Sequence, residues 1–362
     1  MKFEHGGNIY RLAEELKIQE RKIIDFSASI NPLGVSKKIK AEIRKHLKYL
    51  HNYPDPEAKR LRKYLAQYHG IDPETILCGN GSTELIYLII RALKPRKVLI
   101  PAPTFSEYER ACKISNELQV TSYELKQADN FDINPDEFIS SLFTPHSSLP
   151  CDMAFLCNPN NPTGRLLKRE DVEKIADAAK ELKCYLIVDE AFIDFCSGDS
   201  MINKVQNNPY LIVLRSMTKF YAISGLRIGY GVFPQHLIHR LKEYKEPWTV
   251  NSLAQRAAVV ALKDKVYKNE TFKLMREEKR FLEKGFKRLD IEFSPSDTNF
   301  YLLKLSNAKN AKEVYQRLKK RGILLRDCSN FRGLGDTFLR VAVKSHRENT
   351  ILLKELTAIL QS

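Results

Sequence analysis

The sequence predicts an α/β fold, with a mainly parallel central sheet in a large domain and a smaller α+β domain after it. Four short runs of almost continuous apolar residues are typical of strands buried on both faces, and they cover residues 97–103, 153–159, 185–192 and 211–217. Between these runs, residues 104–118 and 167–183 repeat their apolar positions with the period of a helix. Buried strands that alternate with helices favour a parallel sheet covered on both faces.

The pattern of apolar and charged residues changes after about Ala254. A long charged stretch follows at 267–289 and predicts a helix that bridges two domains. Shorter patterns then predict three strands, at 299–305, 322–328 and 338–344, and two helices, at 310–321 and 346–360. We expect three regions: an N-terminal arm with part of the small domain at 1–48, a large ligand-binding domain at 49–262, and a small C-terminal domain at 263–362.

Composition narrows the classes of partner. The net charge of +15 suits nucleic acid, but the basic residues are interleaved with acidic ones and no nucleic-acid-binding motif is present. We therefore expect small anionic substrates and no nucleic acid. No apolar run approaches the roughly 18 residues of a membrane span, and the polar start does not resemble a signal peptide. The expectation is a cytoplasmic protein with no membrane partner.

The cysteines and histidines give no sign of disulfides or of a metal site. The seven cysteines are scattered without a C-x-x-C pair, and several lie in apolar runs, so we expect them to be small buried side chains. Only His236 and His239 are spaced as neighbours on a helix, and no carboxylate or cysteine completes a site with them. No metal is expected.

Polar residues that follow the predicted strands form a coherent set, because ligands of α/β sheets bind where the carboxyl ends of the strands meet. The loop at 78–86 places Gly79 and Gly81 before Ser82 and Thr83, at the start of an apolar-faced helix. A glycine turn at a helix N-terminus presents free N–H groups and the positive end of the helix dipole to an anion. Serine or threonine in this place is also an ordinary helix cap, so the loop alone identifies no site.

Lys219 has unusual neighbours. Ser216 and Arg227 lie on either side of it, and both side chains can bind a phosphate, arginine through two parallel hydrogen bonds. Asp189 ends the preceding predicted strand, where a buried carboxylate needs a cationic partner or has a raised pKa. An isolated aspartate there is more often a cap or part of an ion pair. Together with Lys219, it fits pyridoxal phosphate, which needs a carboxylate at its pyridine nitrogen and a lysine at its aldehyde.

The pattern S-x-x-K-x-x-x-x-x-G-x-R at 216–227, with NNPTG at 160–164 and DEAF at 189–192, resembles the fold-type-I pyridoxal-phosphate enzymes related to aspartate aminotransferase. The similarity extends over essentially the whole chain. It implies the aspartate-aminotransferase-like fold, pyridoxal 5′-phosphate bound in the large domain, and a homodimer.

The resemblance also implies roles for individual residues. Lys219 would hold the cofactor aldehyde and later move protons, while Asp189 would pair with the pyridine nitrogen. Asn161 would bind the ring's phenolic oxygen, and Phe105 would stack on the ring face. The cofactor phosphate would be held by Gly81, Ser82, Thr83, Ser216 and Arg227, joined by Tyr53 of a neighbouring subunit. Arg340 would bind the substrate carboxylate, although an arginine on a strand edge is usually just exposed.

Two subfamilies are similar to this chain, and both act on phosphate monoesters that carry an amino group: L-threonine-O-3-phosphate decarboxylase of cobalamin biosynthesis and histidinol-phosphate aminotransferase. Arg326 looks like the residue that meets the substrate phosphate. The N-terminal His5 and Gly6 resemble a phosphate-clasping loop of the decarboxylases, and Phe192 stands where transaminases commonly have a tyrosine. Ser29 is a departure, because decarboxylases often have an asparagine near the substrate there.

These features favour decarboxylation of L-threonine O-3-phosphate to (R)-1-amino-2-propanol O-2-phosphate. The alternative is a histidinol-phosphate aminotransferase or a related transaminase, and serine phosphate stays open as a substrate. A third hypothesis is a basic nucleic-acid-binding or regulatory protein that keeps the fold without turnover, against which the complete cofactor set argues. The proton donor to Cα is also open, with Lys219 the natural candidate.

Overall fold

The computed structural model describes residues 5–114, 118–143, 150–196, 200–305 and 311–361. Parts of three sequence predictions lie outside the described residues: positions 1–4 of the arm, 115–117 of one helix and 310 of another.

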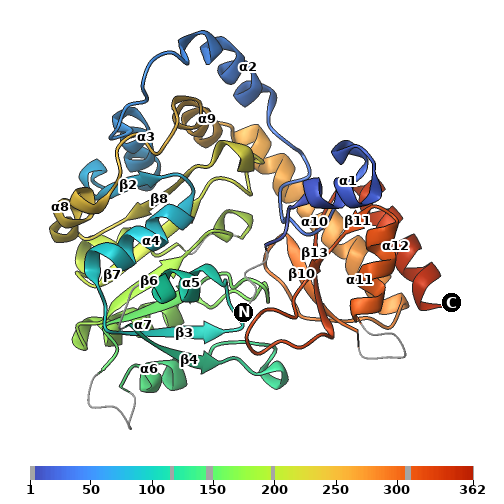
Figure 1. Cartoon of the computed structure of the whole chain (residues 1–362). Helices are drawn as coiled ribbons and strands as arrows, with labels where there is room; N and C mark the ends of the chain where they lie inside the picture. The colour runs from blue at the N-terminus through green and yellow to red at the C-terminus, as the bar shows by residue number, and fades with distance from the viewer. Residues whose placement is uncertain (1–4, 115–117, 144–149, 197–199, 306–310, 362) are drawn as a thin grey trace.

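A seven-stranded sheet forms the centre of the larger part of the molecule (Figure 1). The strand order is β2-β8-β7-β6-β5-β3-β4, and only β8 runs antiparallel to its neighbours. The four predicted strands are present as β3 (Lys97–Ala102), β5 (Met153–Cys157), β6 (Tyr185–Asp189) and β7 (Leu211–Ser216). The others are β2 (Ile76–Gly79), β4 (Gln119–Glu124) and β8 (Gly229–Val232).

Helices cover both faces of this sheet, because successive strand residues point to opposite sides. In β5, Ala154 and Leu156 pack into one core, while Met153 and Phe155 pack into the other. The first core contains α3 (Lys59–His69), α6 (Pro135–Phe143), α7 (Arg169–Glu181) and α9 (Ser252–Leu262), and the second contains α4 (Ser82–Leu93), α5 (Glu107–Ile114) and α8 (Gln235–Tyr244). The predicted doubly covered, mainly parallel sheet is therefore confirmed.

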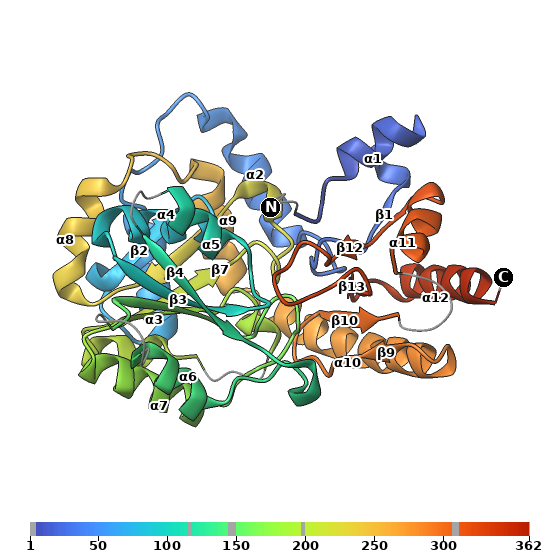
Figure 2. The same cartoon turned by 60° about the horizontal axis from the view of Figure 1, so that its bottom comes forward.

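A four-stranded antiparallel sheet lies to one side of the large sheet (Figure 2). Its order is β12 (Arg326–Asp327), β13 (Phe338–Ala342), β10 (Phe300–Lys304) and β9 (Glu292–Phe293). The predicted long charged helix is α10 (Lys265–Arg288), and α11 (Ala311–Lys320) and α12 (His346–Leu360) follow it. Strands and helices of this C-terminal part agree with the predicted α+β character.

The prediction of one strand over 322–328 is wrong. The structure has two short strands there, β11 (Ile323–Leu324) and β12, which belong to different sheets. β11 pairs in parallel with β1 (Ile24–Asp25), whereas β12 pairs with β13, so the strand breaks where its partner changes. The first pairing joins the N-terminal segment, which also carries α1 (Ile9–Leu16) and α2 (Lys37–His46), to the C-terminal part. The domain boundaries themselves stay a prediction.

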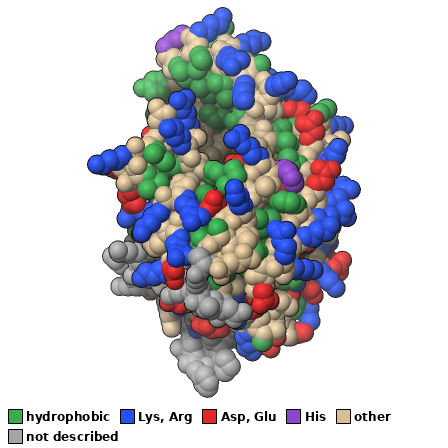
Figure 3. Space-filling view, turned by 90° about the vertical axis from the view of Figure 1, so that its right-hand side faces the viewer, with side chains coloured by type: hydrophobic (Ala, Val, Ile, Leu, Met, Phe, Trp, Pro, Cys, Tyr) green, Lys and Arg blue, Asp and Glu red, His purple; other side chains and the backbone are tan. Residues whose placement is uncertain are grey.

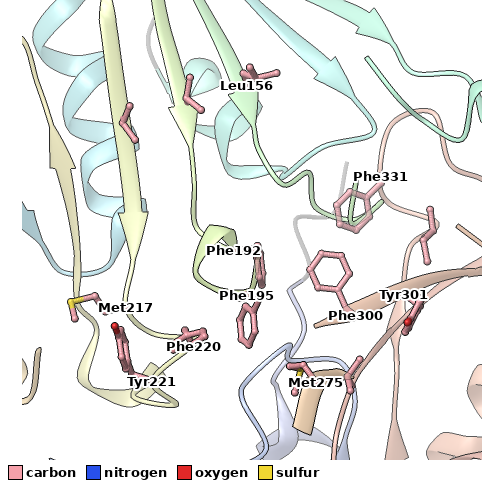
Figure 4. Close-up of a cluster of buried hydrophobic side chains, with 14 of the residues drawn as sticks. Leu156, Phe192, Phe195, Met217, Phe220, Tyr221, Met275, Phe300, Tyr301 and Phe331 are labelled. Carbon is pink, nitrogen blue, oxygen red and sulfur yellow. The ribbon is translucent and has the colours of Figure 1, made fainter. Parts of the chain in front are cut away.

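Aromatic side chains fill the space between the strand ends of the large sheet and the small sheet (Figure 4). The ring of Phe192, after β6, meets Phe300 of β10 edge-on, with 5.0 Å between centroids. Phe195 and Phe220 form a similar pair at 5.1 Å. This cluster packs the two sheets together directly beside the strand ends that the sequence marks as a site.

The structure shows the burial of the cysteines and the distribution of charge on one face of the molecule. All seven cysteines are buried and free. On the face that carries α11 and α12, basic side chains are scattered with acidic ones among them (Figure 3). None of the described helices combines the length and apolar character that crossing a membrane requires.

Candidate active site

A cavity of about 1150 Å³ lies at the carboxyl ends of the central strands, and Arg326 of β12 and Arg340 of β13 contribute to its wall. Most of the residues predicted from sequence line it, namely His5, Gly6, Ser29, Ser82, Thr83, Phe105, Asn161, Asp189, Lys219, Arg227, Arg326 and Arg340. The fold thus brings together residues from the N-terminal segment, the large sheet and the small sheet.

Lys219 lies just beyond β7, and its Nζ donates a hydrogen bond of 3.1 Å to Ser216 Oγ. Ser216 is buried next to the lysine and is also hydrogen-bonded to Thr218 Oγ1 at 2.8 Å. Burial lowers the pKa of Lys219 to about 8, although the charge of Asp189 opposes the shift. A substantial neutral fraction near physiological pH makes this amine a nucleophile.

Asp189 ends β6, the strand paired with β7, so the predicted one-strand separation from Lys219 is confirmed. Its Oδ1 accepts from the Ala191 N–H at 3.0 Å, and its Oδ2 accepts from the Tyr108 hydroxyl at 2.8 Å. Burial raises the pKa of Asp189, while the Tyr108 hydrogen bond and Lys219 lower it. A buried carboxylate of this kind is stabilised by a cationic ligand atom.

The start of α4 forms an anion cradle. Gly81 is its N-cap residue, at φ +77°, and no side chain caps the helix, so Ser82 and Thr83 are not ordinary caps. A Cβ added at Gly81 would lie 2.4 Å from Nη2 of Arg227, because the guanidinium lies against the glycine backbone. Burial also lowers the pKa of Arg227. The cradle therefore combines free helix N–H groups with a partly desolvated cation.

Arg340 is buried on β13, which is an interior strand, so the alternative that it is merely exposed on an edge is wrong. Its guanidinium donates to Asn161 Oδ1 and, at 2.9 Å, to the Ser27 carbonyl. Burial lowers its pKa to about 10. Within the described part of the chain, Arg340 Nε and Ser29 Oγ are buried without a hydrogen-bond partner. Both belong to residues of the cavity wall, where a ligand would supply that partner.

Arg326 lies directly across from Arg340 in the β12–β13 pair. It is buried, stacks at 4.9 Å on Phe331 and donates at 2.8 Å to Asn330 Oδ1. Two like charges in opposite positions on neighbouring strands are unfavourable by themselves. Both arginines line the cavity, where a negatively charged ligand would compensate for their repulsion.

Three predicted site residues, Gly81, Ser216 and Tyr53, are not among the residues that line the cavity. Gly81 and Ser216 lie beside Arg227 and Lys219, which do line it, whereas Tyr53 lies apart. Its side chain is 82% exposed and packs at 5.1 Å against Trp248. The role of Tyr53 on a neighbouring subunit stays a prediction.

The sequence profile of the family "Aminotransferase class I and II" matches residues 21–356. The chain belongs to this family. A threonine-phosphate decarboxylase from Salmonella typhimurium is 38% identical over 359 residues, covering 98% of this chain and 96% of the relative. A histidinol-phosphate aminotransferase from a Thermoanaerobacter strain is 37% identical over 310 residues, covering 85% and 84%. The crystal structure of a histidinol-phosphate aminotransferase from Clostridium acetobutylicum superposes with a TM-score of 0.86 at 32% identity, over 94% and 99%.

Pyridoxal 5′-phosphate is the cofactor of this aminotransferase-family chain. The residues present fit it: a partly neutral lysine suits an aldehyde, a buried carboxylate suits a pyridinium, and the α4 cradle suits a phosphate. Because Asn161 Oδ1 accepts from Arg340, its donor atom Nδ2 is the one suited to a phenolic oxygen.

Sequence reasoning missed two residues of this site. Tyr108 bonds Asp189 from 81 positions away, and Glu107 bonds His5 from 102 positions away. Both follow Phe105 within one helical turn, but nothing in the local pattern indicates their distant partners. Only the position of α5 over the sheet ends reveals these contacts.

Proposed function

We propose that this chain decarboxylates L-threonine O-3-phosphate to (R)-1-amino-2-propanol O-2-phosphate for cobalamin biosynthesis. Bound pyridoxal phosphate supplies an electron sink for the charge left at Cα when one of its bonds breaks. Decarboxylation releases carbon dioxide and requires one proton at Cα. Lys219, whose amine can carry or release a proton near neutral pH, is the proposed donor.

The observation that carries this proposal over amino transfer is the side chain of Phe192. It is 5% exposed, and Lys219 Nζ lies 5.3 Å from the centre of its ring. A phenyl ring offers no hydroxyl to the cofactor's phenolic oxygen, so Asn161 is the proposed partner there. The Salmonella relative, similar over almost the whole chain, supports the same choice.

Substrate orientation decides which bond at Cα breaks. We assign the substrate carboxylate to Arg340 and Ser29, and the substrate phosphate to Arg326, His5 and Gly6. The unpartnered Arg340 Nε and Ser29 Oγ support the first assignment, and the facing pair of arginines supports a substrate with two anionic groups. Two anchored groups at opposite ends of the substrate fix its orientation, whereas a single anchored group would leave the substrate free to rotate.

The test is to give the purified holoenzyme threonine phosphate without any keto acid. Sustained carbon dioxide release that disappears in Lys219→Ala is the expected result. Turnover only with histidinol phosphate plus 2-oxoglutarate would replace the proposal by amino transfer. Serine phosphate, assayed in parallel, measures what the substrate methyl group contributes.

We also propose a homodimer in which Tyr53 reaches the cofactor phosphate of the partner subunit. The exposed Tyr53–Trp248 pair supports this arrangement. If Tyr53 acts across the interface, mixing inactive Tyr53→Ala and Lys219→Ala proteins restores activity, because a mixed dimer has one complete site. No recovery after subunit exchange would place Tyr53 in the cavity of its own chain.

A further inference from the structure

We propose that Glu107 is a positioning residue that holds the segment His5–Gly7 over the cavity through its contact with His5. The inference rests on the proposed function only in that the substrate carries a phosphate. Glu107 does not bind the substrate in this proposal. It sets the place of the histidine that does.

Glu107 is a buried acceptor with several donors around it. Its side chain is 6% exposed, its Oε2 accepts from the Tyr87 hydroxyl at 2.7 Å, and its Oε1 lies 2.8 Å from His5 Nε2. Burial raises its pKa, but the hydrogen bonds from His5 and Tyr87, together with the charges of His5 and Arg110, lower it more, and the net pKa is lowered. The group is therefore an ionised carboxylate, which only accepts, so His5 Nε2 must donate. The other ring nitrogen, Nδ1, is then the one left for the ligand, and it donates to a phosphate oxygen when the ring carries both protons.

The same segment has a second anchor on the opposite side. The Gly7 N–H donates at 2.7 Å to Ser27 Oγ, which itself donates at 2.6 Å to Asp25 of β1. A Cβ at Gly6 would lie 2.2 Å from the Ser27 carbonyl oxygen, so this glycine is needed for the close approach. His5–Gly7 is thus a short strap, tied to β1 at one end and to α5 at the other.

Removing the charge of Glu107 should change substrate binding in opposite directions, depending on whether Glu107 acts through His5 or contacts the substrate itself. Glu107 faces the cavity, and a carboxylate beside a phosphate repels it. If Glu107 acted on the substrate itself, removing its charge would tighten phosphate binding. If it acts through His5, removing its charge loosens the strap and weakens binding.

The test compares Glu107→Gln, His5→Asn and the double variant as holoenzymes. Loss of one charge-assisted hydrogen bond predicts an increase of about tenfold in KM for threonine phosphate in Glu107→Gln, with kcat changed by less than about threefold. The double variant should be no worse than His5→Asn, because Glu107 acts only through that histidine. Glu109→Gln is the matched control, since this carboxylate on the same helix pairs with Lys113 and Arg332 instead. Its KM should equal that of the wild type.

A second measurement needs no turnover. Hydrogen exchange of the peptide that covers residues 5–10 should be faster in Glu107→Gln than in the wild type and unchanged in Glu109→Gln. A lower KM in Glu107→Gln, multiplicative effects in the double variant, or unchanged exchange would each overturn the role of Glu107. If the wild type releases no carbon dioxide but transaminates histidinol phosphate, the proposed function fails alone, and KM is then measured with that phosphate ester.

Discussion

Tyr108 donates a hydrogen bond of 2.8 Å to Asp189 Oδ2, and both residues are buried. Burial raises the pKa of the Tyr108 hydroxyl well above its ordinary value, so it stays a donor at all working pH values. Its ring stacks on Phe155 at 4.7 Å, which fixes the hydroxyl relative to the end of β6. Asp189, the carboxylate that we propose pairs with the cofactor nitrogen, is therefore oriented by a rigid partner.

Tyr108→Phe keeps this stacking and removes only the donor. Because the Tyr108 hydrogen bond lowers the pKa of Asp189, the variant's carboxylate binds a proton more tightly and leaves less positive charge on the cofactor ring. We expect kcat to fall about tenfold, with KM little changed. The cofactor absorption band should shift in the absence of substrate. Wild-type kcat with an unshifted band would show that the hydroxyl does not tune the site.

The lowered pKa of Lys219 predicts how the rate of cofactor uptake depends on pH. Its pKa of about 8 means that the amine is mainly protonated at lower pH and neutral at higher pH. The rate at which cofactor-free protein takes up pyridoxal phosphate should rise with pH and level off above about pH 8. In Asp189→Asn the midpoint should be lower, because the charge of Asp189 raises the pKa of Lys219. A midpoint near the ordinary lysine value of about 10.4 would contradict this prediction.

Gly81→Ala tests the phosphate cradle. The new Cβ would meet Arg227 at 2.4 Å on a backbone with φ +77°, so the arginine or the turn must move. We expect cofactor affinity to fall by at least about tenfold, measured by absorbance titration. Gly225→Ala is the control, because a Cβ there meets nothing within 4 Å although the residue is close to Arg227 in sequence. Equal affinities for the two variants would rule out the steric argument.

The buried ion pair of Glu190 and Arg215 predicts a change in the free energy of unfolding when it is broken. Glu190 accepts from Ser200 Oγ at 2.6 Å and from Arg215 Nη1 at 3.2 Å, and both charged side chains are almost fully buried. Glu190→Ala leaves Arg215 with less compensation and should lower the free energy of unfolding by about 3 kcal/mol, measured with denaturant. Asp136→Ala, which breaks an exposed pair with Lys174, should change it by less than about 1 kcal/mol.

Much of the fold could be predicted because local patterns of apolar and polar residues indicate its strands and helices. The strands β3, β5, β6 and β7 are short apolar runs, and their order along the chain alternates with helices such as α7. The segment at 322–328 was predicted wrongly for the opposite reason. Its apolar run is continuous, and the change of partner from β1 to β13 comes from distant segments that leave no mark in it.

The residues of the candidate site also fall into two groups: those that local motifs predict and those whose contacts only the tertiary structure shows. Local motifs predicted Lys219, Ser216, Arg227 and the α4 glycine turn, because these residues are close in sequence to the strand ends that carry them. The cofactor predicted from them and from Asp189 is confirmed by the family, and the roles of the individual residues stay predictions. Tertiary structure alone decided that Arg340 is buried in an interior strand facing Arg326 and that Glu107 holds His5. Such contacts join residues far apart in the sequence: Glu107 and His5 are 102 positions apart, and Arg340 donates to the Ser27 carbonyl across 313 positions. They depend on how two sheets pack around one cavity, and such packing is a property of the whole fold.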